Sequence, residues 1–114
     1  RFGNVMESKG NVFEVWEEEM KNNKPLSITD PSMKRYFFHL DEAVNFVLKC
    51  IPIMKEGEIF VPKMKSYKVK DLATKISKNH KIIGLRKGEK MDEILITDEE
   101  KKRTKKLDDM WIIK

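Results

Sequence analysis

Apolar residues near the start of the chain recur at the spacing of one face of an α-helix. The positions that share this face are Val12, Phe13, Trp16 and Met20. A period of 3.6 residues per turn predicts an amphipathic helix over residues 12–22, with the Asn11 side chain as its N-cap. Pro25 follows closely and is expected to stop the helix.

Two further apolar patterns also have helical spacing. The first consists of Ala43, Val44, Val47, Leu48 and Ile51, and the second of Val69, Leu72, Ala73 and Ile76. The first covers most of the helix circumference, which predicts a helix that is capped by Asp41 and buried on more than one side. The second covers a single face. Thr97 and Glu100 match a capping box, which predicts a short helix after Thr97.

Short apolar and aromatic runs between these helices predict strands. The runs are residues 2–5, 35–40, 59–61, 81–85 and 110–113. Strands that alternate with helices indicate an α/β fold with some parallel pairing. Continuous apolar strands belong in sheets covered on both faces, and 114 residues provide little cover. We therefore expect residues 1–114 to form one segment of a larger fold.

The chain is strongly charged, with 38% charged residues, 39% hydrophobic residues and a net charge of +5. A positive excess favours either nucleic-acid binding or attraction of a small anion such as a diphosphate. The densest basic run, residues 101–106, directly follows the acidic residues 98–100. Much of that run is therefore expected to be a solvated helix face with opposite charges beside it, which disfavours nucleic acid.

Cysteine usage and hydropathy bear on the location of the protein. Cys50 is the only cysteine, which excludes an internal disulfide and is compatible with a reducing cytoplasm. No apolar run approaches the roughly 20 residues that cross a bilayer. We therefore expect a cytoplasmic protein without a membrane partner.

Motif spacing alone indicates no catalytic chemistry. No Gly-x-Gly-x-x-Gly follows a predicted strand, and no Walker phosphate loop is present. His39 and His80 each lack a second histidine or cysteine at ligand spacing, so no metal site is expected. Spacing by itself supports an α/β segment and nothing more specific.

Five stretches of the chain, taken together, carry a family resemblance. They are residues 1–5 (RFGNV), 8–12 (SKGNV), 29–37 (TDPSMKRYF), 57–63 (GEIFVPK) and 83–93 (IGLRKGEKMDE). In order and spacing they resemble the C-terminal, substrate-binding part of the UDP-N-acetylglucosamine 4,6-dehydratase and capsular-polysaccharide epimerase group. That group belongs to the extended short-chain dehydrogenases/reductases. The positions that depart from its pattern are Glu7, Lys9, Lys34, Lys87 and Asp92.

The resemblance implies a nicotinamide cofactor, usually NADP, held by an N-terminal Rossmann domain that these 114 residues do not include. It also implies a catalytic Tyr-x-x-x-Lys pair upstream. Tyr36 is followed four residues later by Leu40, and Tyr67 by Asp71, so neither supplies that pair. We therefore expect no catalytic and no cofactor-binding residue in this chain, and no cofactor for this chain alone.

The resemblance further implies a substrate site made of Asn4, Arg35, Arg86 and Glu89. A guanidinium offers a rigid pair of donors to diphosphate oxygens, which suits Arg86, and Arg35 is expected to add a second cation. Glu89 is expected to accept hydrogen bonds from ribose hydroxyls. Asn4, at the end of a strand, is expected to bond a phosphate or a sugar hydroxyl.

These expectations define two functions. The first is the substrate-binding part of an NADP-dependent nucleotide-sugar 4,6-dehydratase or epimerase that acts on a UDP-hexose such as UDP-N-acetylglucosamine and is inactive alone. Its partners are the UDP-sugar and either the Rossmann half or a homo-oligomer. The alternative is a small basic module that uses the lysine run and Trp111 to bind nucleic acid or an acidic protein partner.

Overall fold

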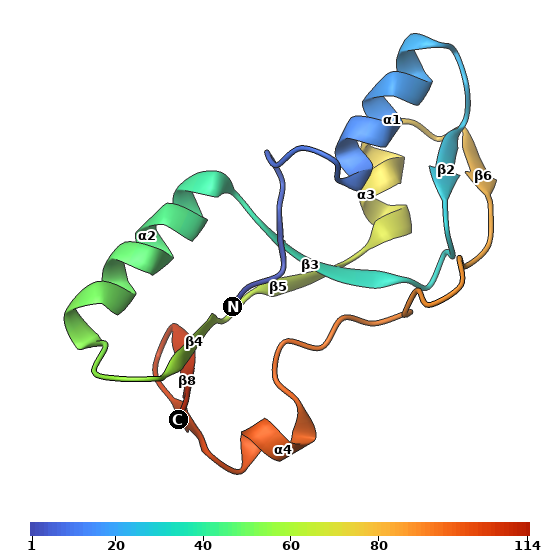
Figure 1. Cartoon of the computed structure of the whole chain (residues 1–114). Coiled ribbons are helices and arrows are strands. Elements are labelled where there is room, and N and C mark those ends of the chain that lie inside the picture. The colour runs from blue at the N-terminus through green and yellow to red at the C-terminus, as the bar shows by residue number, and fades with distance from the viewer.

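The computed structural model describes all residues, 1–114, as an elongated molecule that measures 51 × 28 × 21 Å. Its Cα radius of gyration is 16.5 Å, whereas a compact domain of this length is expected near about 13 Å. Two groups of elements lie at opposite ends, and the segments that contain β3 (Lys34–Phe38) and β5 (Lys65–Lys68) connect them (Figure 1). The chain therefore forms two small cores instead of one large one.

The first end contains α1 (Val12–Lys21), β2 (Leu26–Ile28), α3 (Val69–Ile76) and β6 (His80–Ile82). Strands β2 and β6 pair in parallel, and the two helices pack beside them (Figure 1). The buried side chains of this core are Trp16, Leu26, Ile28, Met33, Phe37, Val69, Leu72 and Ala73. The Trp16 indole nitrogen donates to the Ser27 carbonyl at 2.8 Å, so the largest core residue also satisfies its polar atom.

The connecting sheet has the order β1 (Asn4–Val5), β3 (Lys34–Phe38), β5 (Lys65–Lys68). Strand β1 runs parallel to β3, with Asn4 opposite Phe37, and β5 runs antiparallel to β3. Gly3 permits the close approach of β1, because a Cβ atom there would lie 2.8 Å from the Tyr36 Cβ. Asn4 is thereby held directly against β3.

The second end contains α2 (Leu40–Cys50), a 3₁₀ turn (Ile51–Ile53), β4 (Ile59–Pro62), α4 (Asp98–Lys101), β7 (Thr104–Lys106) and β8 (Met110–Ile113). The strands form an antiparallel sheet with the order β4-β8-β7. Its small core holds Phe46, Cys50 and Met110. None of the helices is both long and apolar enough to cross a membrane.

Several predictions from local pattern are confirmed. Asn11 caps α1, since its side-chain oxygen accepts the Phe13 and Glu14 N–H groups at 3.1 and 3.3 Å. Thr97 and Glu100 form the predicted capping box. The parallel pairs β1/β3 and β2/β6 confirm an α/β arrangement with some parallel pairing.

Other predictions are wrong. Helix α2 begins at Leu40 with His39 as its N-cap residue, not Asp41. The basic run is not a helix face, because α4 ends at Lys101 and residues 104–106 form β7. The short strands β2, β5 and β7 were not predicted, since none has a continuous apolar run.

Within this chain α2 is buried on one side only. Its buried residues are Ala43, Phe46 and Cys50, and the last two belong to the small core. The exposed α2 stripe consists of Leu40, Val44, Val47 and Leu48 on the opposite side, together with Ile51 directly after the helix, and their exposed fractions lie between 48% and 58%. The expectation of burial on more than one side is thus not met by residues 1–114.

Candidate functional site

A tight turn brings Arg86 and Glu89 together. The Glu89 N–H donates to the Arg86 carbonyl at 3.0 Å, and Gly88 between them has a positive φ of 86°. The Arg86 Nε lies 3.9 Å from the Glu89 carboxylate. The Arg86 side chain is 80% exposed and the Glu89 side chain 30% exposed. At this distance the pair is not hydrogen-bonded, and no other side chain or carbonyl accepts from the guanidinium, so its donors stay available to an anion.

Arg35 fastens the loop that follows this turn to β3. Its guanidinium donates to the carbonyls of Lys34, Lys90 and Met91 at 2.7, 2.6 and 3.1 Å. The Lys34 N–H donates to the Met91 carbonyl at 2.9 Å. Three of the five donors of Arg35 are therefore used inside the protein. Arg35 positions the loop that carries Glu89 and keeps fewer donors for a ligand than Arg86 does.

Asn4 is held by a residue that the sequence did not single out, Glu93. The Asn4 amide nitrogen donates to the Tyr36 carbonyl at 3.1 Å and to the Glu93 carboxylate at 3.4 Å. The same carboxylate accepts the Tyr36 N–H at 3.1 Å. The Glu93 carboxylate thus binds both β3, through Tyr36, and the first residue of β1, Asn4. Its place as the last residue of the fifth stretch was the one signal that pointed to it.

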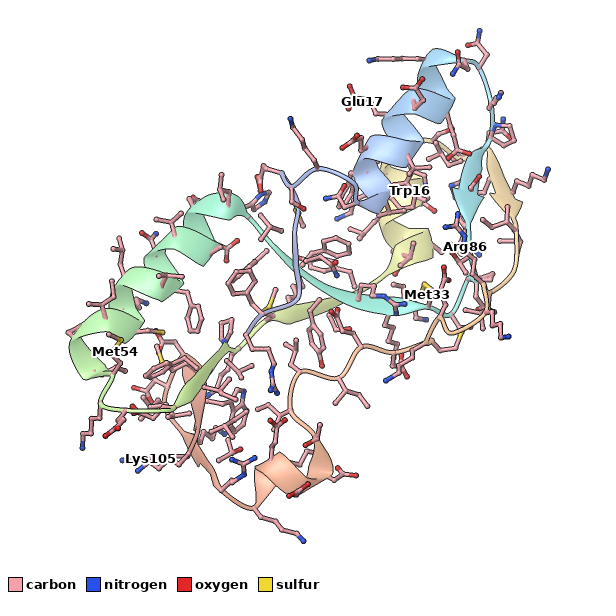
Figure 2. All side chains as sticks on the ribbon, viewed as in Figure 1. Trp16, Glu17, Met33, Met54, Arg86 and Lys105 are labelled. Atoms are coloured by element: carbon pink, nitrogen blue, oxygen red, sulfur yellow. The ribbon has the colours of Figure 1, made fainter.

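A hollow of about 320 Å³ lies beside these residues. It is lined by Lys34, Arg35, Tyr36, Ser66, Asp92 and Glu93. Two of the positions that depart from the family pattern, Lys34 and Asp92, share this lining. The structure therefore places Arg35 in the lining of this hollow and joins Asn4 to it through Glu93. Arg86 and Glu89 lie on the preceding turn, and Figure 2 shows Arg86 toward the end of the molecule that holds Met33 and Trp16.

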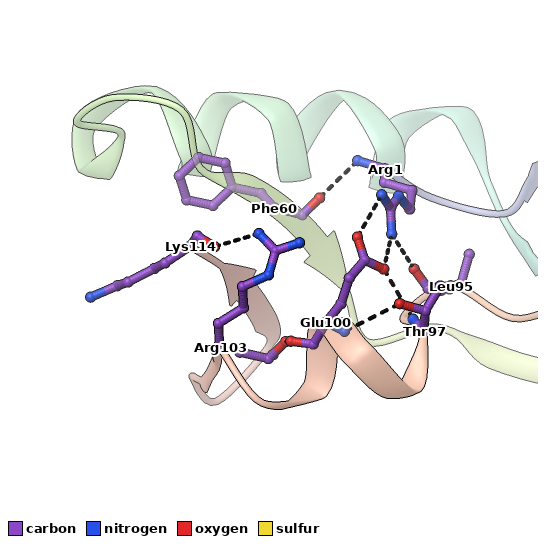
Figure 3. Close-up of polar contacts among 8 residues, drawn as sticks. Arg1, Phe60, Leu95, Thr97, Glu100, Arg103 and Lys114 are labelled. Carbon is purple, nitrogen blue, oxygen red and sulfur yellow. Dashed lines mark hydrogen bonds and ion pairs between the residues drawn. The ribbon is translucent and has the colours of Figure 1, made fainter.

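A second polar cluster holds the segment that follows Glu93 in the sequence, and it joins Arg1 to Leu95 and Glu100 (Figure 3). The Arg1 guanidinium donates to both Glu100 oxygens, at 2.7 and 3.0 Å, and to the Leu95 carbonyl at 2.9 Å. The Thr97 N–H also donates to Glu100, at 3.0 Å. Hydrogen bonds from Arg1 and then from the Thr97 backbone lower the pKa of Glu100 from 4.5 to about 2.

This cluster predicts a loss of stability in acid. A carboxyl with a lowered pKa in the folded state stabilises the fold above its unfolded pKa, near 4.5, and that contribution is lost as the pH falls towards 2. We expect Glu100→Gln to lower the melting temperature at pH 7. The difference in melting temperature between the variant and the parent should become smaller as the pH falls from 4.5 to 2. Thermal melts followed by circular dichroism measure both.

Glu99→Gln is the matched control, because the Glu99 side chain is exposed and makes no hydrogen bond or ion pair. Its melting temperature should follow that of the parent at every pH. Parallel curves for Glu100→Gln and the parent between pH 4.5 and 2 would contradict the assignment of this acid sensitivity to Glu100.

Comparison with known proteins places this arrangement in a class. The family model described as polysaccharide biosynthesis protein matches residues 1–114. The chain is 40% identical over 116 residues to a UDP-N-acetylglucosamine 4,6-dehydratase (inverting) of Campylobacter jejuni. The matched region covers 99% of this chain and 35% of that protein. The chain is also 37% identical over 119 residues to a UDP-glucose 4-epimerase of Rickettsia canadensis, with coverage of 99% and 35%.

The solved structures contain the same fold. The X-ray structure of Pen from Bacillus thuringiensis matches with a TM-score of 0.86 and 38% identity, over 99% of this chain and 38% of that one. This match confirms the predicted fold class, a mixed α/β segment of an extended short-chain dehydrogenase/reductase. The chain belongs to the polysaccharide biosynthesis protein family. It spans about 35% of the length of the two curated relatives named above.

Proposed function

We propose that this chain supplies the UDP-sugar-binding part of a nucleotide-sugar 4,6-dehydratase or epimerase in polysaccharide biosynthesis. The observation that carries the proposal is the turn of residues 86–89, which presents an exposed guanidinium without a hydrogen-bond acceptor beside a carboxylate. Two relatives whose names specify a UDP-sugar substrate, at 40% and 37% identity, support the choice of ligand. Both reaction types occur among the relatives, so both stay within the proposal.

The two side chains of the turn suit different parts of such a ligand. Arg86 can donate two parallel N–H groups to oxygens of the diphosphate, a geometry that a single ammonium cannot reproduce. Glu89 can accept hydrogen bonds from a pair of ribose hydroxyls. The two groups are 3.9 Å apart in the free chain. An arriving diphosphate would replace this weak ion pair with charge-assisted hydrogen bonds to Arg86.

Arg35 holds the loop after this turn and lines the adjacent hollow, whereas Asn4 is bonded to Tyr36 and Glu93, two residues of that lining. Arg35 contributes positive charge there, although its guanidinium is largely bonded to the carbonyls of Lys34, Lys90 and Met91. The Asn4 amide N–H groups are bonded to Tyr36 and Glu93. In the free chain both residues are thus ordered by the protein, which reduces the entropy that ligand binding must overcome.

We propose NADP as the cofactor of the complete enzyme, bound by residues outside 1–114. The chain has no glycine-rich turn between a strand and a helix, since Gly84 and Gly88 flank Arg86 in a loop. Such a turn is what a dinucleotide pyrophosphate requires. Residues 1–114 therefore lack the turn that would hold a dinucleotide.

The proposal predicts binding without turnover. We expect the chain to bind UDP and UDP-N-acetylglucosamine in calorimetric titrations and to give no 4-keto or epimerised product when NADP is added, because it has no Tyr-x-x-x-Lys pair. Product formation is followed by nuclear magnetic resonance of the sugar protons. Turnover above background would contradict the expected inactivity, and the absence of UDP binding would contradict the proposed site.

A further inference from the structure

The face of the β4-β8-β7 sheet that bears Trp111 has a trough, which adjoins the hollow beside Arg35 and shares Tyr36 and Glu93 with it. It has a volume of about 460 Å³, and its mainly apolar lining includes Val61, Pro62, Met64, Ile94, Ile96 and Trp111. A smaller hollow of about 270 Å³ adjoins it and shares Ile96, Lys101 and Trp111. Ile94 is 67% exposed, so the trough presents an apolar side chain to water.

Cations surround the Trp111 ring. The Lys63 and Lys106 ammonium nitrogens lie 5.2 and 5.5 Å from the ring centroid, within the range of cation–π contact. Lys63 is further held by donating to the Asp108 carbonyl at 2.9 Å. Lys101 lines both hollows. The trough is therefore an apolar groove with positively charged side chains held at its edge.

The nearby carboxylates compensate part of this charge. Glu93, the one acidic residue in the lining, accepts hydrogen bonds from the neutral Asn4 amide and Tyr36 N–H, so it keeps its charge and offsets one of the lysines. Asp98 pairs with Lys101 at 3.2 Å, but both side chains are exposed, and such a pair is worth little. Neither Lys63 nor Lys106 has a carboxylate within 4 Å. The edge is thus electrostatically suited to acidic groups of an occupant.

Strand alternation separates the basic run into two surfaces. Lys106 lies opposite Trp111 in the β7/β8 ladder, whereas Lys105 lies opposite Ile112 and so points to the other face of the sheet. Lys105 lines a separate hollow with Ile53 and Lys114, and it lies toward the same end of the molecule as Met54 (Figure 2). Arg103 donates to the Lys114 carbonyl at 2.7 Å. A continuous basic track for a nucleic-acid backbone is therefore not formed.

The Trp111 ring is also poorly suited to stack a nucleobase. Base recognition by single-strand binders uses an open aromatic face, and here two ammonium groups already lie over the ring. The apolar lining suits an aliphatic or aromatic side chain instead. We propose that this trough binds an acidic peptide segment of a partner protein, with one apolar side chain in the trough and carboxylates at Lys63, Lys101 and Lys106.

The test uses a fluorescein-labelled peptide, Glu-Glu-Leu-Phe-Glu-Glu, in fluorescence anisotropy titrations with the protein. We expect saturable binding that is lost when the apolar pair is replaced by serine, and lost when the glutamates are replaced by lysine. The double variant Lys63→Gln, Lys106→Gln should raise the Kd about tenfold or more, since it removes two charged contacts.

The matched control is Lys102→Gln, Lys105→Gln, which changes the net charge equally and leaves the trough intact. It should alter the Kd by less than about twofold, because exposed charges beyond roughly 8 Å are screened in physiological salt. Circular dichroism melts establish that both double variants fold.

Three outcomes would overturn the proposal. They are no saturable binding of the peptide at millimolar concentration, equal losses in the two double variants, and displacement of the peptide by a 12-nucleotide oligothymidylate that itself binds more tightly. The last result would assign the surface to nucleic acid.

Discussion

Replacing Arg86 with alanine is expected to weaken the binding of UDP by about 10- to 150-fold, the loss that corresponds to a charge-assisted contact of about 1.5–3 kcal/mol. The guanidinium is 80% exposed and no protein acceptor takes its donors, so the substitution removes ligand contacts with little effect on the fold. Isothermal titration calorimetry with UDP gives the affinity, and a thermal melt verifies that the fold is unchanged.

Three variants separate this site from its surroundings. Arg86→Lys should recover only part of the affinity, since one ammonium does not reproduce the paired donors. Arg35→Ala should lower both the affinity and the melting temperature, because it removes three hydrogen bonds to backbone carbonyls. Replacing Lys101, Lys102, Lys105 and Lys106 with glutamine should change UDP affinity little. An Arg86→Ala protein that binds UDP as tightly as the parent would show that the proposed site is wrong.

The second large effect is expected at the exposed α2 stripe. Apolar side chains that share one helix face and are about half exposed promote association. We expect the chain to form dimers or larger particles at about 100 μM in multi-angle light scattering. The triple variant Val44→Lys, Val47→Lys, Leu48→Lys should then return the mass to that of a 13.5 kDa monomer, since it places three like charges on the stripe.

The control for this experiment uses exposed apolar residues that do not share the stripe. Val15, Met20 and Ile76 are 50%, 46% and 39% exposed, and they lie on α1 and α3. Changing all three to lysine adds the same charge and should leave the association intact. A parent chain that is monomeric at this concentration would contradict the expected association through the exposed α2 stripe.

The sequence was sufficient wherever a structure depends on neighbours in the chain. The Asn11 cap of α1 and the Thr97–Glu100 capping box each join groups at most three residues apart. Their formation therefore depends on local spacing, which the sequence displays directly. The five ordered stretches were also sufficient to identify the family, because their order and spacing can be compared without any knowledge of tertiary contacts.

Contacts between residues far apart in the chain decided the features that the sequence did not predict. At the start of helix α2, Glu7, 33 residues earlier, accepts the Leu40 N–H at 2.8 Å, in addition to the local bond from the His39 N–H to Glu42. Arg35 resembles a ligand-binding residue in sequence, yet the carbonyls of Lys90 and Met91 hold it, at separations of 55 and 56 residues.

The basic run gives the clearest separation between local pattern and tertiary structure. Residues 101–106 are one cluster of charge in the sequence, but pairing of β7 with β8 sends Lys105 and Lys106 to opposite faces of a sheet. Trp111 lines an apolar trough on one face, and Lys105 lines a separate hollow on the other. Composition determined that this end of the protein is positive. Which lysines share a surface depended on the register of β7 against β8, and that register is set by long-range pairing that no local pattern encodes.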